Sequence, residues 1–210
     1  MIRFILVVLY LILYLILFLP VLLVEWIIGK FNPGLKARSS KALVSWGFRC
    51  IAFLSGAKVT VKGLENIPTD TAVLYVGNHR SFFDVILTLS YFPGVTGYVA
   101  KIEMKKAPIL RIWMKNIHCL FLDRKNIKEG LKTILAGVEE VKNGYSMCIF
   151  PEGTRNKVND TFLPFHDGSF KIAEKGKVPI VPMTLVNTAA IFEDHLPKIK
   201  KANVIIDFAL

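Results

Sequence analysis

The segment from Phe4 to Val24 constrains this chain most, because it is apolar throughout and contains no charged residue. A helix of that length extends about 31 Å, at about 1.5 Å per residue, which matches the roughly 30 Å hydrocarbon core of a bilayer. A cleaved signal peptide would have a shorter apolar region followed by small residues, whereas this run continues into Glu25–Ile28. We therefore expect a retained membrane anchor, which Pro20 is able to kink.

The charges on either side of this run predict its orientation. Only Arg3 and the amino terminus precede it. Basic residues dominate the segment that follows: Lys30, Lys36, Arg38, Lys41, Arg49, Lys58 and Lys62. Because cytoplasmic flanks of membrane segments carry the excess of lysine and arginine, the bulk of the chain is expected on the cytoplasmic side of a membrane. These side chains either serve only as stop-transfer charges or also attract anionic headgroups, and the two roles are compatible.

A second apolar segment, Ala42–Ser55, follows a Pro33-Gly34 pair. It is short for a membrane span and contains Arg49, so an interfacial or re-entrant helix fits it better. The sequence thus predicts an N-terminal two-helix membrane anchor over residues 1–55. A hairpin dipped into one leaflet and a span followed by a surface helix both remain open.

From Gly56 onward, short runs of β-forming residues alternate with segments whose apolar residues recur with the period of an α-helix. This alternation predicts one α/β domain over residues 56–210. Such alternation is typical of a mostly parallel sheet covered by helices. The expected strands are Lys58–Val61, Ala72–Val76, Gly97–Ala100, His118–Leu122, Ser146–Phe150, Ile180–Val186 and Val204–Phe208. The expected helices are Phe82–Tyr91, Ala107–Asn116, Ile127–Asn143 and Ser169–Lys175, with Asn126 as the cap of the third.

The net charge of +11 indicates a polyanionic partner, which is nucleic acid, an anionic membrane or a phosphorylated substrate. Nucleic acid is the least favoured, because no recognition motif is present and the cations cluster near the apolar segments and after predicted strands. The three cysteines have no C-x-x-C spacing, so we expect neither a disulfide framework nor a zinc site. No metal motif or P-loop is found, and no cofactor is expected.

Polar clusters follow four of the predicted strands, at the edge of the sheet where ligands of parallel sheets bind. The clusters are Gly77-Asn78-His79, Lys101, Asp123-Arg124-Lys125 and Pro151-Glu152-Gly153-Thr154-Arg155. Arg124 and Lys101, with Lys125 in reserve, are candidate phosphate ligands. Backbone N–H groups around Gly153 and the Arg155 guanidinium suit a phosphate or an oxyanion, and an ordinary Pro-Gly turn is the equal alternative.

His79 and Asp84 form a candidate acid–base pair. Neutral imidazole accepts a proton near pH 7, and a neighbouring carboxylate fixes its tautomer. Residues five positions apart point about 140° away from each other on a straight helix. The two side chains therefore meet only if His79 lies in a loop and Asp84 in the first turns of the next helix. For an isolated pair, a structural histidine and a capping aspartate are the alternative.

Other reactive side chains are weaker candidates. Ser81 is not surrounded by a G-x-S-x-G elbow. Cys119 and Cys148 lie within apolar runs, which favours inert core thiols. His118 falls within a predicted strand and is interpreted as structural, and His166 is expected in a turn, with substrate contact as the less favoured role.

Four sequence blocks carry a resemblance to a known family. Asn78–Asp84 resembles the N-H-x-x-x-x-D signature of the 1-acyl-sn-glycerol-3-phosphate acyltransferases, a family of glycerolipid acyltransferases. Leu120–Arg124 resembles the family's phosphate-binding block, Phe150–Arg155 matches its F-P-E-G-T-R block without change, and Val178–Pro182 resembles its fourth block. The blocks occur in the family's order. One departure is Cys119-Leu120, where many members place a glycine before the aromatic residue.

The resemblance implies a membrane-bound enzyme that transfers a fatty acyl group from acyl-CoA or acyl carrier protein to the free hydroxyl of 1-acyl-sn-glycerol-3-phosphate, giving phosphatidic acid. It implies that His79 deprotonates the hydroxyl while Asp84 orients the imidazole, without an acyl-enzyme. The substrate-binding residues that it implies are Lys101, Arg124, Glu152, Gly153, Thr154 and Arg155.

Three alternatives remain open from the sequence. Another lysophospholipid or glycerol-3-phosphate is the alternative acceptor within the same class. An acyl-thioester hydrolase using Ser81 or a cysteine, and a non-catalytic basic lipid-binding module, are the alternatives from other classes. The acyl chain length, the donor carrier and the oligomeric state are not specified by the sequence.

Overall fold

The computed structural model describes residues 1–158 and 161–209. Within them, seven strands form one sheet in the order β1-β7-β6-β2-β5-β3-β4. The strands are β1 (Ala57–Lys62), β2 (Leu74–Gly77), β3 (Thr96–Lys101), β4 (Leu120–Leu122), β5 (Ser146–Ile149), β6 (Ile180–Val186) and β7 (Ala202–Phe208). Every neighbouring pair is parallel except β6 and β7, which are antiparallel. The predicted mostly parallel sheet is therefore confirmed.

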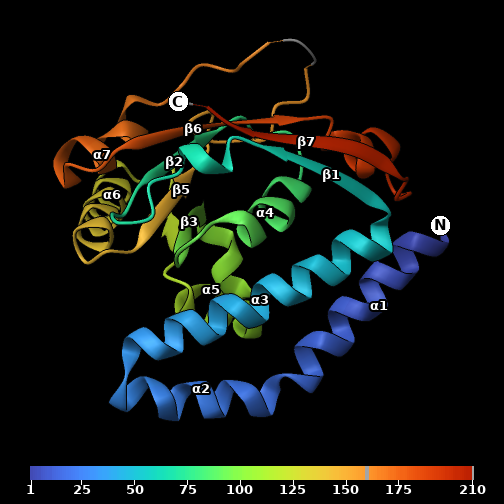
Figure 1. Cartoon of the computed structure of the whole chain (residues 1–210), viewed down its shortest axis with the longest axis horizontal. Helices are drawn as coiled ribbons and strands as arrows, with labels where there is room; N and C mark the ends of the chain where they lie inside the picture. The colour runs from blue at the N-terminus through green and yellow to red at the C-terminus, as the bar shows by residue number, and fades with distance from the viewer. Residues whose placement is uncertain (159–160, 210) are drawn as a thin grey trace.

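Helices cover both faces of this sheet (Figure 1). The α-helices are α1 (Ile2–Leu17), α2 (Leu19–Phe31), α3 (Pro33–Ser55), α4 (Phe83–Thr88), α5 (Pro108–Asn116), α6 (Ile127–Lys142) and α7 (Lys171–Gly176). The 3-10 helices are η1 (Leu64–Asn66), η2 (Leu89–Tyr91), η3 (Ile102–Lys106), η4 (Asp167–Phe170), η5 (Ala189–Ile191) and η6 (Glu193–His195). Consecutive residues of β2 point to opposite faces, so Tyr75 packs with α4 and α5 residues and Leu74 with residues of α6 and α7.

The predicted elements of the α/β domain agree closely with the observed ones, and Asn126 caps α6 by accepting a hydrogen bond from the Glu129 N–H at 3.1 Å. One prediction was wrong: His118 does not belong to a strand. Its backbone is left-handed, with φ 62°, because the chain reverses there between α5 and β4. Its ring stacks on Tyr145 and its Nδ1 lies 2.7 Å from a Glu140 carboxylate oxygen, which agrees with a structural role.

The N-terminal segment differs from the two-helix arrangement expected from its composition. It forms three helices, because α1 ends at Leu17 and α2 begins at Leu19, with Phe18 between them and a bend of 49°. Pro20 lies at the start of α2, where its missing N–H and its ring prevent continuation of the preceding helix. Among the described residues, no single helix has the length and apolarity to cross a membrane; α1 and α2 taken together have both, as a bent pair.

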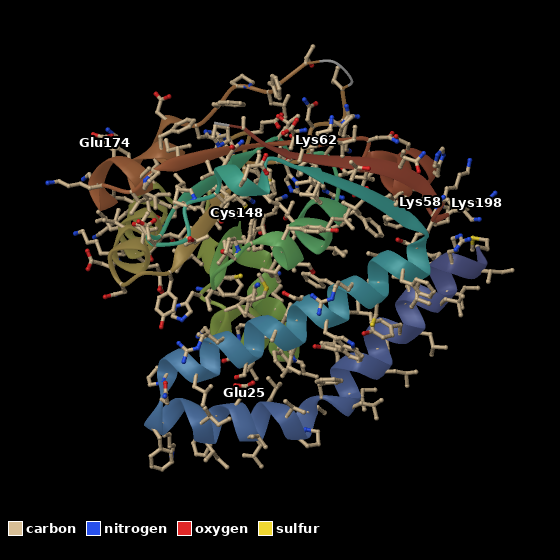
Figure 2. The ribbon with its side chains drawn as sticks, viewed as in Figure 1. Glu25, Lys58, Lys62, Cys148, Glu174 and Lys198 are labelled. Carbon is tan, nitrogen blue, oxygen red and sulfur yellow. The ribbon has the colours of Figure 1, made fainter. Side chains whose placement is uncertain are left out.

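The helix α3 lies between this bent pair and the sheet domain (Figure 1). The Tyr14 hydroxyl donates to the Leu43 carbonyl at 3.0 Å, and the buried Glu25 carboxylate accepts from the Ser39 hydroxyl at 2.9 Å. Figure 2 shows Glu25 between α2 and α3. The inner side of α1 and α2 is therefore held by specific contacts, while many apolar side chains on their outer side remain exposed.

Candidate active site

His79 and Asp84 are in contact, in the loop-and-helix arrangement that their spacing allows. His79 lies in the loop after β2, Asp84 lies in the first turn of α4, and His79 Nδ1 is 2.8 Å from Asp84 Oδ2. The Asp84 side chain is completely buried, and the His79 side chain is 19% exposed. Because the Asp84 carboxylate accepts a hydrogen bond from the Nδ1–H, the neutral ring has its lone pair on Nε2, the nitrogen that can act as a base.

The position of the Asp84 carboxylate is fixed by the backbone before it. Its Oδ2 accepts hydrogen bonds from the Arg80 N–H at 2.7 Å and from the Ser81 N–H at 2.8 Å. A buried carboxylate that receives charge-assisted hydrogen bonds from fixed backbone donors has little freedom to rotate. The loop thus holds the acid, and the acid in turn orients the imidazole.

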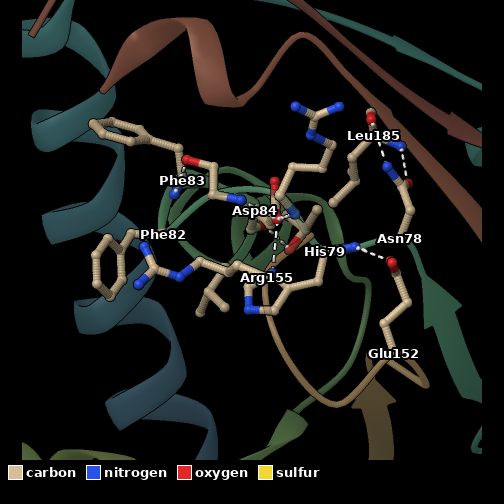
Figure 3. A network of polar contacts seen from close by, with 12 residues as sticks. Asn78, His79, Phe82, Phe83, Asp84, Glu152, Arg155 and Leu185 are labelled. Carbon is tan, nitrogen blue, oxygen red and sulfur yellow. Dashed lines mark hydrogen bonds and ion pairs between the residues drawn. The ribbon is translucent and has the colours of Figure 1, made fainter. Parts of the chain in front are cut away.

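The His79 ring and backbone are held by the segment that follows β5. The ring stacks on Phe150, with centroids 4.2 Å apart and an interplanar angle of 13°. The His79 N–H donates to Glu152 Oε1 at 3.0 Å, and the His79 carbonyl accepts from the Asn156 N–H at 2.7 Å. Figure 3 shows His79 beside both Asp84 and Glu152. The first and third sequence blocks therefore form one structural unit.

Glu152 is buried, and its contacts define its role within this unit. Its second oxygen, Oε2, accepts from the Leu163 N–H at 3.0 Å, so both carboxylate oxygens bind backbone groups. The next residue, Gly153, has a φ of 69°, and a Cβ added to it would lie 2.9 Å from the His166 ring. Only glycine fits this left-handed position without strain. Thr154 is exposed at the same turn.

The two candidate arginines have different surroundings. The Arg155 Nη1 forms an ion pair with Glu193 Oε1 at 2.9 Å, and its guanidinium lies 3.8 Å from the centroid of the Phe82 ring. The Arg124 Nε is 3.9 Å from the point that a Cβ on Gly153 would occupy, so Arg124 reaches from the end of β4 across to the turn after β5. Partial burial lowers the pKa of the Arg124 guanidinium.

Lys101 ends β3 and is paired in register with Leu122 of β4. Its side chain is exposed. His79 follows β2 and Lys101 ends β3, so both lie at the same edge of the sheet. Because β5 lies between β2 and β3, the two residues are two strands apart along that edge. The structure therefore brings His79, Asp84 and Glu152 into contact, brings Arg124 to Gly153, and leaves Lys101 further along that edge.

Three contributors were missed by the sequence analysis as site residues: Phe150, Asn78 and Glu193. Both Phe150 and Asn78 were within the quoted blocks, and the available signal was that Asn78 directly precedes His79 and that Phe150 begins the F-P-E-G-T-R block. Glu193 lies in η6, far along the chain from the loop that it contacts, and no motif surrounds it. His166, expected in a turn, contributes its ring to the surroundings of Gly153.

The nucleophile alternatives are not supported by their environments. Ser81 is fully buried, and its hydroxyl binds Glu193 and the Phe83 N–H. Burial raises the pKa of the Cys119 thiol to about 12 and that of Cys148 well above its ordinary value. Figure 2 shows Cys148 within the sheet domain. Within the described ranges, no cluster of three metal-ligating side chains occurs.

This chain is similar in sequence to known proteins. Residues 58–186 match the sequence profile of the Acyltransferase family. A probable 1-acyl-sn-glycerol-3-phosphate acyltransferase of Mycoplasma pneumoniae is 32% identical over 185 residues, covering 86% of this chain and 66% of that protein. The 1-acyl-sn-glycerol-3-phosphate acyltransferase of Saccharomyces cerevisiae is 34% identical over 146 residues, covering 69% and 48%. The chain thus spans about 37% to 66% of the length of the curated relatives that it matches.

A solved structure shares the fold. The crystal structure of the 1-acyl-sn-glycerophosphate acyltransferase PlsC from Thermotoga maritima has a TM-score of 0.76 and 22% identity, covering 99% of this chain and 85% of that one. Fold and site together define a helix-covered α/β domain with a histidine–aspartate pair at the carboxyl edge of its sheet. The chain belongs to the Acyltransferase family, and the resemblance seen in its four sequence blocks is confirmed.

Proposed function

We propose that this protein transfers a fatty acyl group from an acyl thioester to the free hydroxyl of 1-acyl-sn-glycerol-3-phosphate, giving phosphatidic acid. The observation that carries the proposal is the 2.8 Å contact between His79 Nδ1 and the buried Asp84 carboxylate, beside a turn that Arg124 approaches. The names of the matched relatives support the same acceptor.

The reaction needs one base and no protein nucleophile. His79 Nε2 takes the proton of the acceptor hydroxyl while the hydroxyl oxygen attacks the thioester carbonyl carbon. The new C–O bond forms, the C–S bond breaks, and the imidazolium returns its proton to the departing sulfur. Asp84 stabilises the imidazolium between these two steps, and general-base help of this kind contributes about 10²–10⁴-fold.

Arg124 is the proposed ligand for the acceptor phosphate. A guanidinium presents a planar fork of donors that binds phosphate oxygens in pairs. Arg124 lies by Gly153, whereas the Arg155 guanidinium is neutralised by Glu193. Lys101 adds positive charge along the same edge, at a longer range. Glu152, Gly153 and Thr154 are proposed to shape the turn that faces the acceptor.

The helices of residues 1–55 are proposed to hold residues 56–210 on a membrane, with the catalytic domain on the cytoplasmic side. The exposed side chains on α1 and α2 are mostly apolar, as a surface in contact with lipid requires. The Lys30 ammonium lies 3.8 Å from the Trp26 ring, a combination suited to the interface of a membrane. Anchoring the site beside two lipid-soluble substrates favours their encounter.

An acyl-transfer assay tests the proposal directly. Purified protein is given lysophosphatidic acid with acyl-CoA or acyl carrier protein thioesters, and phosphatidic acid and free thiol are measured together. We expect both products in equal amounts, and a rate at least about tenfold lower when the phosphate is esterified, because a charge-assisted contact is weakened. Equal rates with a lysophosphodiester would assign another acceptor. Release of free fatty acid without phosphatidic acid would instead indicate a hydrolase.

A further inference from the structure

Glu193 connects two parts of the site that are far apart in the sequence. We infer that Glu193 is a positioning residue: it holds the N-terminus of α4 against Arg155 and thereby keeps the His79–Asp84 pair in its reactive geometry. This inference rests on the proposed function, and it assigns a role to a residue beyond the 58–186 segment that matches the family.

The contacts of Glu193 use both carboxylate oxygens. Oε1 accepts from the Phe82 N–H at 2.8 Å and from Arg155 Nη1 at 2.9 Å, and Oε2 accepts from the Ser81 hydroxyl at 2.5 Å. The Glu193 side chain is only 15% exposed. Charge-assisted hydrogen bonds with so little access to water are stronger than those on the surface.

Ser81 connects Glu193 to the catalytic pair. Its hydroxyl binds Glu193, while its N–H donates to Asp84 Oδ2 at 2.8 Å. The same hydroxyl accepts from the Phe83 N–H at 2.9 Å, so the first turn of α4 is tied to this point as well. Loss of the Glu193 carboxylate would free Ser81 to shift, and the Asp84 carboxylate and the imidazole that it orients would shift with it.

Arg155 completes the network of contacts around Glu193. Its guanidinium is paired with Glu193 and lies over Phe82, whose own N–H binds the same Glu193 oxygen. Figure 3 shows the Arg155 side chain extended toward Phe82. Substitutions of Glu193 and Arg155 should therefore alter the rate of the chemical step more than the affinity for the acceptor.

A double-mutant cycle with Asp84 tests the inference. Glu193→Ala should lower kcat by about 10- to 100-fold in the otherwise unchanged protein, because small misplacements of reacting groups are costly, and should change KM for the acceptor by less than about threefold. In an Asp84→Asn background, the same substitution should lower kcat by less than about threefold, because the pair through which it acts is already disabled. Glu193→Gln, which keeps an acceptor oxygen, should recover part of the loss.

The matched control is Glu140→Ala, which removes a carboxylate from the other histidine–carboxylate pair, that of His118. Its kcat should stay within about twofold of the unsubstituted protein. Equal losses for Glu193→Ala in both backgrounds, or a change confined to KM, would overturn the inference. Thermal unfolding of each variant checks that its activity is measured on folded protein.

A spectroscopic readout separates failure of the inference from failure of the proposed function. If the unsubstituted protein does not acylate lysophosphatidic acid, the proposed function fails, and the ¹⁵N resonances of the His79 ring still report the Asp84 contact. Glu193→Ala should change these resonances and Glu140→Ala should not. Unchanged His79 resonances in Glu193→Ala would overturn the positioning role whatever the activity.

Discussion

The side-chain amide of Asn78 exchanges two hydrogen bonds with the backbone of Leu185. Asn78 Nδ2 donates to the Leu185 carbonyl at 2.9 Å, and Asn78 Oδ1 accepts from the Leu185 N–H at 2.7 Å (Figure 3). Asn78 follows β2 and Leu185 belongs to β6, so the amide continues the pairing of the two strands beyond the end of β2. The next residue is His79, and the amide therefore fixes where the catalytic loop leaves the sheet.

Asn78→Ala should lower the free energy of unfolding by about 1–3 kcal/mol, because it leaves two backbone groups of Leu185 without their partner. It should also lower kcat, since the base is the adjacent residue. Asn203→Ala, on an exposed position of β7, is the control and should change stability by less than about 0.5 kcal/mol. Urea unfolding measures both. Equal stability of the two variants would contradict the role of Asn78.

Arg124 and Arg155 should respond differently to substitution. Arg124→Ala should raise KM for the acceptor by about 10-fold or more, the cost of one charge-assisted hydrogen bond, whereas Arg155→Ala should act mainly on kcat. Lys142→Ala removes a surface cation that pairs with Glu139 and serves as the control. Steady-state kinetics with lysophosphatidic acid measures kcat and KM for each variant. A larger KM effect for Arg155→Ala than for Arg124→Ala would reverse the assignment of the phosphate ligand.

The buried thiols predict a loss of stability at high pH. Burial raises the pKa of Cys119 from its ordinary value of 9.0 to about 12, so the thiol of the folded protein stays neutral where that of the unfolded chain ionises. This contribution to stability is complete below about pH 9 and is lost as the pH rises toward 12. Urea unfolding at pH 8 and pH 10 should show a smaller pH-dependent loss in Cys119→Ala than in the unsubstituted protein. An identical loss would show that burial of this thiol is not responsible.

The exposed aromatic residues of α2 should contribute to membrane binding. Trp26 is 55% and Phe31 is 85% exposed, and burial of a large apolar side chain is worth about 1.5–3 kcal/mol. Trp26→Ser with Phe31→Ser should therefore weaken sedimentation with anionic lipid vesicles by at least about tenfold. Leu131→Ser, on an exposed position of α6, is the control and should bind as the unsubstituted protein does. Unchanged binding of the α2 variant would contradict the proposed anchor.

Local patterns in the sequence predicted most of the fold and the catalytic pair. The His79–Asp84 contact was predictable because a single loop and one helical turn separate the two side chains. The strands were predictable from alternation of β-rich and helix-period segments, which requires only local information. The meeting of Arg124 with the Gly153 turn followed from the rule that parallel strands present their carboxyl ends at one edge.

Features that depend on distant pairing were not predictable in this way. No pattern around Glu193 indicates that it binds a loop more than a hundred positions earlier, because an isolated carboxylate is usually solvated. The antiparallel pairing of β6 with β7 is set by contacts across the whole sheet. The break at Phe18 was foreseen only in part, because Pro20 can either kink a helix or begin a new one.

The most direct test of the central claim compares two histidines that each pair with a carboxylate. Phosphatidic acid formation from lysophosphatidic acid and an acyl thioester is measured for His79→Asn and for His118→Asn, whose asparagine suits the left-handed backbone at that position. We predict that His79→Asn loses at least about 10²-fold and that His118→Asn stays within about twofold of the unsubstituted protein. A rate for His79→Asn close to that of the unsubstituted protein would contradict the account.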